Sequence, residues 1–208
     1  MKAQIHAENH RRCDGSFVTL FGAGMSVGGI GTRITNNIFT GNTQGGGGFG
    51  AAIGGNSASP IIAGNIFTNN SSDSQFLSGA VSFVNGSSPV IQNNLFFNNQ
   101  GRGLNLTLPT GNAPVVSNNV FWGNTSAIRL DARVDTAAVT FQNNIIGGNM
   151  IGFEVDFHSA SQGLATWRDN LMYDNTAGYS GISSLTHAYG NIEGNPLSSI
   201  WRVATSAC

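Results

Sequence analysis

Charged side chains are scarce in this chain, which has 9 Lys and Arg and 10 Asp and Glu among 208 residues and a formal net charge of −1. The basic residues are spread thinly, so the sequence has no cationic patch that would bind duplex nucleic acid. No apolar run approaches the roughly 18 residues that span a bilayer, so we expect no membrane insertion. The first residues also lack the apolar core of a signal peptide. The two cysteines, Cys13 and Cys208, stand far apart and indicate no redox compartment.

One short phrase recurs six times along the chain. It reads Ile34-Thr-Asn-Asn37-Ile-Phe39-Thr-Gly-Asn42 at its first occurrence and Trp167-Arg-Asp-Asn170-Leu-Met172-Tyr-Asp-Asn175 at its last. Two asparagine columns are unbroken, and the first steps by 28, 29, 25, 25 and 26 residues. Self-similarity with this period indicates a solenoid, in which each coil contacts only its neighbours.

Each repeat has the pattern of short strands rather than helices. Its apolar residues lie two or three apart and are interrupted by Gly, Asn, Ser and Pro. We therefore predict an all-β parallel β-helix of six to seven coils, in which like positions stack about 4.8 Å apart. An asparagine amide in such a column can donate to one neighbour and accept from the next. We expect the first column to form an internal ladder and not a binding site: Asn37, Asn65, Asn94, Asn119, Asn144 and Asn170.

A second strand in each coil should be anchored inward by one apolar residue. We assign these anchors to Val27, Ile53, Val81, Leu104, Ile128, Phe153 and Ile182. Because side chains alternate along a strand, the flanking residues should point outward. Nine of the 19 charges fall between residues 129 and 174, so the outer side becomes charged from Ile128 onward. We predict three outward columns: Asn105, Arg129, Glu154 and Ser183; Thr107, Asp131, Asp156 and Leu185; and Arg133, His158 and His187.

The charged columns contain the candidate ligand-binding patch, formed by Arg129, Asp131, Arg133, Glu154, Asp156 and His158. Asp131 and Asp156 should lie about 5 Å apart and repel each other, so the pair could hold a Ca²⁺ ion. The basic side chains would then contact an acidic sugar, and the carboxylate separation would also suit a retaining glycosidase. The alternative is a solvated charged strand with no ligand, because charged groups of this kind are often only structural.

A second candidate surface is apolar. One residue after each ladder asparagine stands an aliphatic residue, in the series Ile38, Ile66, Leu95, Val120, Ile145 and Leu171. Two residues further on, three of the coils carry an aromatic residue, namely Phe97, Trp122 and Tyr173. If the phenylalanines at Phe39 and its equivalents point inward, these neighbours should point outward. An exposed strip of this kind contacts a sugar ring, a partner or another part of the same protein.

The repeat resembles that of the right-handed parallel β-helix family, the pectate-lyase-like superfamily. The resemblance rests on an apolar residue, an asparagine three positions on and a phenylalanine two further, and it covers roughly residues 23 to 195. It implies a right-handed β-helix and a mostly extracellular set of relatives: polysaccharide lyases and hydrolases, phage tail spikes and surface proteins. No catalytic signature matches residue by residue, so no catalytic residue is assigned and one fold can host many functions.

The domain organisation follows from the extent of the repeat. We predict an N-terminal segment or partial cap over 1–22, β-helix repeats over 23–195 and a truncated C-terminal segment over 196–208. The closing Asn195-Pro196-Leu197 is similar to the family's Asp-Pro-Leu-Phe phrase, which suggests a piece of a longer exported protein. We expect an extracellular or cell-surface module for carbohydrate contact or surface display. The alternative is a polysaccharide lyase or glycoside hydrolase acting on an acidic polysaccharide.

Overall fold

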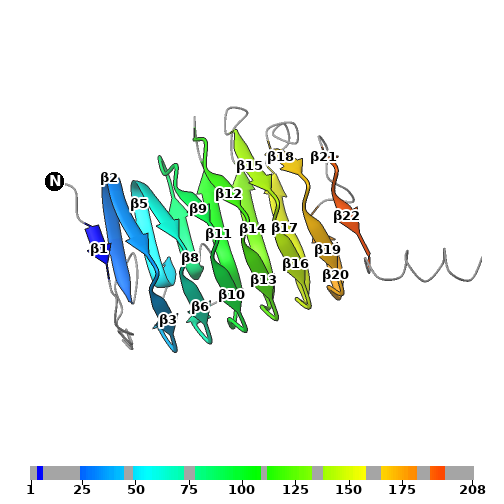
Figure 1. Ribbon diagram of the computed structural model, residues 1–208, viewed down its shortest axis with the longest axis horizontal. Coiled ribbons are helices and arrows are strands. Elements are labelled where there is room, and N and C mark those ends of the chain that lie inside the picture. The colour runs from blue at the N-terminus through cyan, green and yellow to red at the C-terminus, as the bar shows by residue number, and fades with distance from the viewer. Residues whose placement is uncertain are drawn as a thin grey trace, which may run out of the picture.

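The chain winds as a parallel β-solenoid, seen in Figure 1 as a stack of strand layers running from β1 to β22. The computed structural model describes residues 4–6, 24–44, 49–72, 78–108, 112–132, 138–157, 165–181 and 188–194. No residue in these ranges lies in a helix. The predicted all-β parallel solenoid is therefore confirmed.

The solenoid has three faces, each built from one strand of every coil. The first face consists of β8 (Gly79–Val84), β11 (Arg102–Leu108), β14 (Ser126–Ala132), β17 (Ile151–Phe157) and β20 (Ala177–Ser180). The second face consists of β9 (Val90–Gln92), β12 (Val115–Ser117), β15 (Val139–Gln142), β18 (Ala165–Arg168) and β21 (Ala188–Tyr189). The third face is a seven-stranded sheet of β3 (Ile38–Thr40), β6 (Ile66–Thr68), β10 (Leu95–Phe97), β13 (Val120–Trp122), β16 (Ile145–Gly147), β19 (Leu171–Tyr173) and β22 (Ile192–Glu193).

Two long strands join the first and second faces. The strands β2 (Met25–Thr35) and β5 (Gly50–Ala63) pair with each other, and β5 continues from β8 on one face to β9 on the other. The first and second faces thereby form one 13-stranded sheet. Three short strands complete the described structure: β1 (Gln4–His6), which pairs with β2, and β4 (Thr43–Gln44), which pairs with β7 (Ser71–Ser72).

The corner between the second and third faces explains why the repeat contains an Asn-Asn doublet. The first residue of each doublet turns the corner with a positive φ, between 54° and 57° at Asn93, Asn118 and Asn143. Glycine stands at the same place in one coil, at Gly64, because this backbone conformation favours residues without a branched Cβ. The second residue of the doublet is then free to face the interior.

The predicted asparagine ladder is confirmed. Asn94 is typical: its Nδ2 donates to Oδ1 of Asn119 at 3.0 Å and to the backbone oxygen of Ile62 at 3.0 Å. The same pattern links the predicted members from Asn37 onward and extends one coil further, to Asn191, which the sequence analysis did not include. The second asparagine column forms its own ladder through Asn42, Asn70, Asn99, Asn124, Asn149 and Asn175.

The core between the faces contains stacked aromatic rings. Phe39, Phe67, Phe96 and Phe121 are buried and stack coil on coil, with ring centroids 5.1, 4.8 and 4.5 Å apart. Their predicted inward direction is confirmed. Because each ring lies nearly parallel to the next, the column fills the interior without steps that would leave cavities.

The inward anchors of the first face are confirmed from Ile53 to Phe153, and Val27 is buried as predicted, but the column is continued by other residues at both ends. Ile53, Val81, Leu104, Ile128 and Phe153 are in register from coil to coil. Before them, Met25 pairs with Ile53, while Val27 pairs with Gly55 two positions further along the strand.

After the anchors, Tyr179 rather than Ile182 pairs with Phe153. Tyr179 follows the ladder residue Asn175 by four positions, as Phe153 follows Asn149, so the spacing is kept while the residue type changes. Ile182 lies outside the described residues.

Candidate functional site

The outer side of β11, β14 and β17, here named the charged face, carries the predicted patch. Register pairs Arg129 with Glu154 and Asp131 with Asp156, as predicted. In the next coil the predicted member Ser183 is wrong, because Ser180 pairs with Glu154. The other predicted members of these columns, Leu185, Arg133, His158 and His187, lie outside the described residues together with Ser183.

Arg129 lies at the centre of the charged face. Its Nη2 is 3.2 Å from Oδ2 of Asp156 and 3.5 Å from Oδ2 of Asp131, so one guanidinium bridges the two stacked aspartates. Its Nε lies 3.5 Å from Oε1 of Glu154, and its Nη1 donates to Oδ1 of Asn105 at 3.2 Å. The repulsion expected between the two aspartates is thus offset by an arginine of the same face.

Arg102 completes this network and was missed by the sequence analysis. It donates from Nε and Nη2 to the two oxygens of Glu154, at 2.9 and 2.7 Å, in the two-pronged geometry that favours arginine–carboxylate pairs. Strict alternation with the inward Leu104 would direct Arg102 inward. Gly103 also faces the core, however, since a Cβ there would stand 3.2 Å from a ring carbon of Phe121. The alternation is therefore broken and Arg102 lies outside.

The charged face is buried over most of its extent. Asp131 is 0 % exposed and Arg129 is 8 % exposed, whereas the side chain of Asp156 is 57 % exposed. The expected alternative of a solvated charged strand therefore holds only at the β17 edge. Buried ion pairs of this kind cost desolvation and are stable only when their hydrogen-bonding groups are satisfied, as in this network.

The chemistry open to the charged face is limited by these contacts. Both oxygens of Glu154 accept hydrogen bonds from Arg102, and one oxygen of each aspartate lies against Arg129. Within the described part of the chain, no three or more His, Cys, Asp and Glu side chains gather in a way that could hold a metal ion. The Ca²⁺ site at Asp131 and Asp156 stays a prediction.

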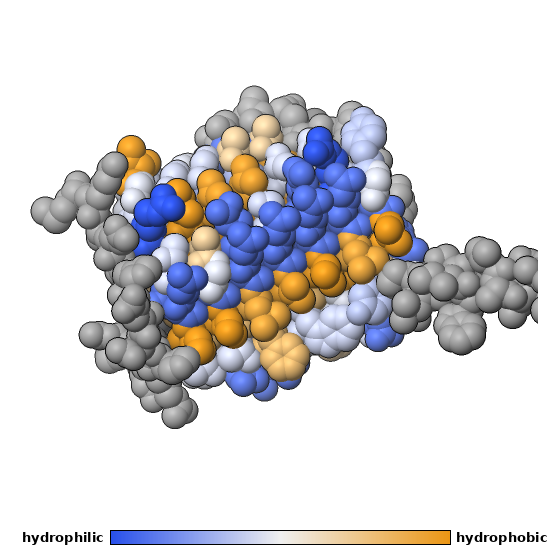
Figure 2. Space-filling view, viewed as in Figure 1, coloured by the Kyte–Doolittle hydropathy of each residue, from blue (hydrophilic) through white to orange (hydrophobic). Residues whose placement is uncertain are grey.

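The third face carries the second candidate surface. Its strands align two outward columns, which we name together the apolar strip. The aliphatic column contains Ile38, Ile66, Leu95, Val120, Ile145, Leu171 and Ile192. The mixed column contains Thr40, Thr68, Phe97, Trp122, Gly147 and Tyr173. Figure 2 shows the aliphatic column as an orange row beside a blue band of polar residues. The predicted outward direction is confirmed, with Ile66, Phe97 and Ile145 among the exposed apolar residues.

Trp122 and Tyr173 form an aromatic cluster within the strip. Their ring centroids are 5.5 Å apart although two coils separate them. The indole bridges the intervening coil because Gly147 has no side chain: a Cβ there would stand 2.6 Å from Cζ3 of Trp122. Gly148 leaves room for the rest of the ring in the same way, since a Cβ there would stand 2.9 Å from Cε2 of Trp122. The indole thus lies flat on the backbone of β16.

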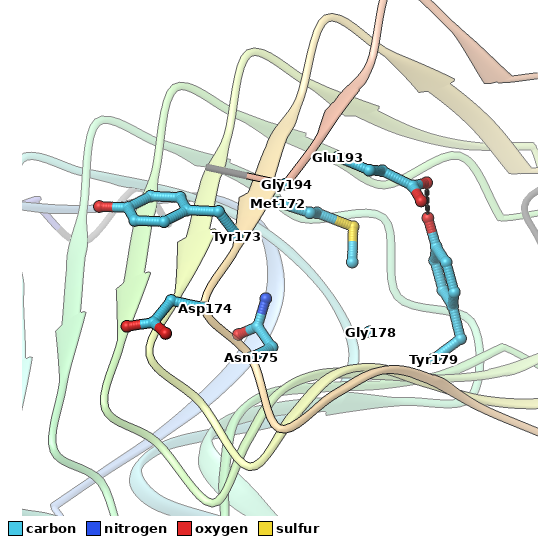
Figure 3. Close-up of a pocket in the computed structure, with 8 residues that line it drawn as sticks. All are labelled: Met172, Tyr173, Asp174, Asn175, Gly178, Tyr179, Glu193 and Gly194. Atoms are coloured by element: carbon cyan, nitrogen blue, oxygen red, sulfur yellow. Dashed lines mark hydrogen bonds between the residues drawn. The ribbon is translucent and has the colours of Figure 1, made fainter. Parts of the chain in front are cut away.

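A pocket of about 240 Å³ opens where the described coils end, between β19, β20 and β22 (Figure 3). Met172 and Gly178 line it together with Tyr179, whose hydroxyl donates a hydrogen bond to Glu193. Burial, and secondarily this bond and the nearby Glu193 charge, raise the pKa of the Tyr179 phenol well above its usual range. Glu193 is in register with Met172, so an apolar core column ends here in a carboxylate.

Comparison with known proteins gives the family. The sequence matches the right-handed beta helix region over residues 11–177, and the chain therefore belongs to that family. No curated protein matches it. A trypsin-treated variant of QnrB1, described as a plasmid-mediated fluoroquinolone resistance protein, is 12% identical over 88% of this chain and 97% of its own, with a TM-score of 0.21. A likeness this low supports no inference. Within the described ranges, no helix has the length and apolar character needed to cross a bilayer.

Proposed function

We propose that this right-handed β-helix chain is an extracellular or cell-surface module that contacts carbohydrate. The observation that carries the proposal is the aromatic cluster of Trp122 and Tyr173 on the exposed third face. A sugar ring presents an apolar C–H face and a rim of hydroxyls, so it suits a surface where aromatic rings lie beside polar groups. The resemblance to secreted lyases and surface proteins supports the location.

The apolar strip supports this role better than the charged face does. A ligand needs an accessible surface, and on the charged face Asp131 is buried and Arg129 is nearly so. The side chains of the strip are partly or fully exposed along the seven strands of the third face, and asparagines at the adjoining corner, Asn69 and Asn98, are exposed as well. Side-chain amides there can donate to and accept from sugar hydroxyls.

The proposal is tested by binding to immobilised polysaccharides. We expect retention of the chain on at least one insoluble or gel-embedded polysaccharide, and loss of retention in Trp122→Ala. Tyr189, on β21 of the second face and 61% exposed, provides a matched aromatic control, and Tyr189→Ala should bind as the parent does. Equal retention of Trp122→Ala and the parent on every matrix would argue against the strip as the contact surface.

A second candidate is a polysaccharide lyase or glycoside hydrolase acting on an acidic polysaccharide. The observation in its favour is the registered pair Asp131 and Asp156 beside two arginines. An enzyme of this kind would release unsaturated or reducing ends from polygalacturonate, and Asp156→Asn would abolish the release. Absence of product with the parent chain, with and without Ca²⁺, counts against the enzyme on this substrate and leaves the binding module.

A further inference from the structure

We infer that the ligand of the apolar strip is a neutral glycan that lies along the solenoid axis, with its rings stacked on Trp122 and Tyr173. This inference rests on the proposed carbohydrate contact and adds the charge of the ligand, its direction and the residues that seat it. Three observations support it: the position of the indole, the alignment of the columns and the charges around them.

The indole of Trp122 packs against the backbone of two glycines, Gly147 and Gly148. Five of its ring atoms lie within 3.2 Å of the positions that Cβ atoms would occupy at Gly147 and Gly148. One ring face is therefore against the backbone, while the residue as a whole remains partly exposed. A ring seated in this way has few other orientations, so stacking a sugar on its outer face costs little conformational entropy.

The columns of the strip run along the solenoid axis and so set the direction of an elongated ligand. Phe97, Trp122, Gly147 and Tyr173 are consecutive members of one column. At about 4.8 Å per coil, the aromatic stretch from Phe97 to Tyr173 extends over about 14 Å. The aliphatic column beside it offers a parallel apolar edge. A single sugar ring would cover only part of this length, whereas a chain of rings along the axis would cover all of it.

Polar groups beside the rings are amides and a carboxylate, not cations. The amide oxygen of Asn98 lies 2.3 Å from where a Cβ of Gly123 would stand, so this side chain leans toward the residue that follows Trp122. Asp174 follows Tyr173 and is exposed. Among the described residues of the third face and the corner that follows it, none is Lys, Arg or His. An anionic glycan would meet a carboxylate and no balancing charge, so a neutral glycan fits better.

The inference is tested with soluble oligosaccharides and the full chain by titration calorimetry. The neutral probes are cello-, xylo- and manno-oligosaccharides from the disaccharide to the hexasaccharide, and the acidic probes are oligogalacturonates of matching length. We expect one neutral series to bind, with affinity that rises with length until the aromatic stretch is covered. Trp122→Ala should weaken the hexasaccharide about tenfold or more, since aromatic anchors dominate such contacts.

Gly147→Ala provides an independent test that does not remove the ring. The added Cβ would stand 2.6 Å from Cζ3 of Trp122 and 3.1 Å from the backbone oxygen of Tyr173, so the indole must move most, and binding should fall while the variant still folds. Tyr189→Ala is the control that should bind as the parent does, and thermal melting verifies that each variant is folded.

The outcomes separate the inference from the proposed function. Stronger binding of oligogalacturonate than of any neutral series, or neutral binding unchanged in Trp122→Ala and Gly147→Ala, overturns the inference and leaves carbohydrate contact standing. Absence of binding by every probe overturns both. Self-association of the parent that is lost in Trp122→Ala, without glycan binding, assigns the strip to a second copy and also overturns both.

Discussion

The backbone N–H of Asn94 and its own side-chain amide donate to the same atom, Oδ1 of Asn119, each at 3.0 Å. One carboxamide oxygen therefore satisfies two buried donors of the preceding coil. Because the ladder repeats this geometry, each asparagine both supports the coil before it and depends on the coil after it.

Replacing Asn119 by Leu should lower the free energy of unfolding by about 1 to 3 kcal/mol, because the buried donors of Asn94 lose their acceptor and Asn144 loses a donor. Urea denaturation measures the change, and Asn144→Leu should give a similar loss. Gln142→Leu makes the same change of residue type at a half-buried position outside the ladder and should cost much less. A midpoint unchanged in Asn119→Leu would contradict the role of the ladder.

Replacing Arg129 by Met should destabilise the fold by about 3 kcal/mol or more, since it removes the guanidinium from a fully buried carboxylate at Asp131. The double variant Arg129→Met with Asp131→Asn should recover much of the loss. Arg168, which lies 3.6 Å from Asp169 with both side chains about half exposed, provides the control. Arg168→Met should change the stability by less than about 1 kcal/mol. Equal effects at the two arginines would contradict the buried network.

Calcium distinguishes the guanidinium bridge from the predicted metal site. With Arg129 between Asp131 and Asp156, we expect no rise in melting temperature when Ca²⁺ is added to the parent chain, and a rise in Arg129→Gln, where two hard oxygen donors become available. A rise in the parent that vanishes in Asp156→Asn would instead establish the predicted site.

The Tyr179 phenol should make the fold sensitive to alkali. Its pKa is raised in the folded state, so the unfolded chain loses this proton first, at about pH 10. The associated stability is fully present below about pH 10 and is lost as the pH rises toward the higher folded pKa. Tyr179→Phe should flatten the decline in unfolding free energy above about pH 10, and Glu193→Gln should reduce it in part. An identical alkaline decline in Tyr179→Phe and the parent would refute this assignment.

The repeat made much of the fold predictable. Constant spacing fixes which residues stack, so the ladder, the phenylalanine column, the pairing of Arg129 with Glu154 and the outward apolar strip could be read from the sequence. The errors arose at the ends of the first face, where the assigned anchors departed from the spacing. Ile182 was assigned as an anchor, although Tyr179 stands at the position that the spacing requires.

Alternation could not predict the network of the charged face. Alternation gives the direction of a side chain, but it does not say which residues the side chain contacts or how deeply it is buried. The contact of Arg102 with Glu154, across the intervening strand β14, could therefore not be inferred. Nor could the burial of Asp131, which depends on surroundings that a single strand does not encode. The packing of Trp122 on two glycines was missed for a similar reason: Gly147 contributes by leaving space, and an absent side chain gives no signal in a hydropathy pattern.

The asparagine ladders give the solenoid a polarity. In both ladders every bond from one asparagine side chain to the next runs from the N-terminal coil to the C-terminal one, so these bonds share one direction from end to end. At the start of the second ladder, the Oδ1 of Asn42 is buried and has no hydrogen-bond partner among the residues that the structure describes. A coil that joins this end must therefore bring an N–H donor, while one that joins the opposite end must bring an oxygen. Through its ladders the rod can be extended head to tail only, because two like ends would present donor to donor or acceptor to acceptor.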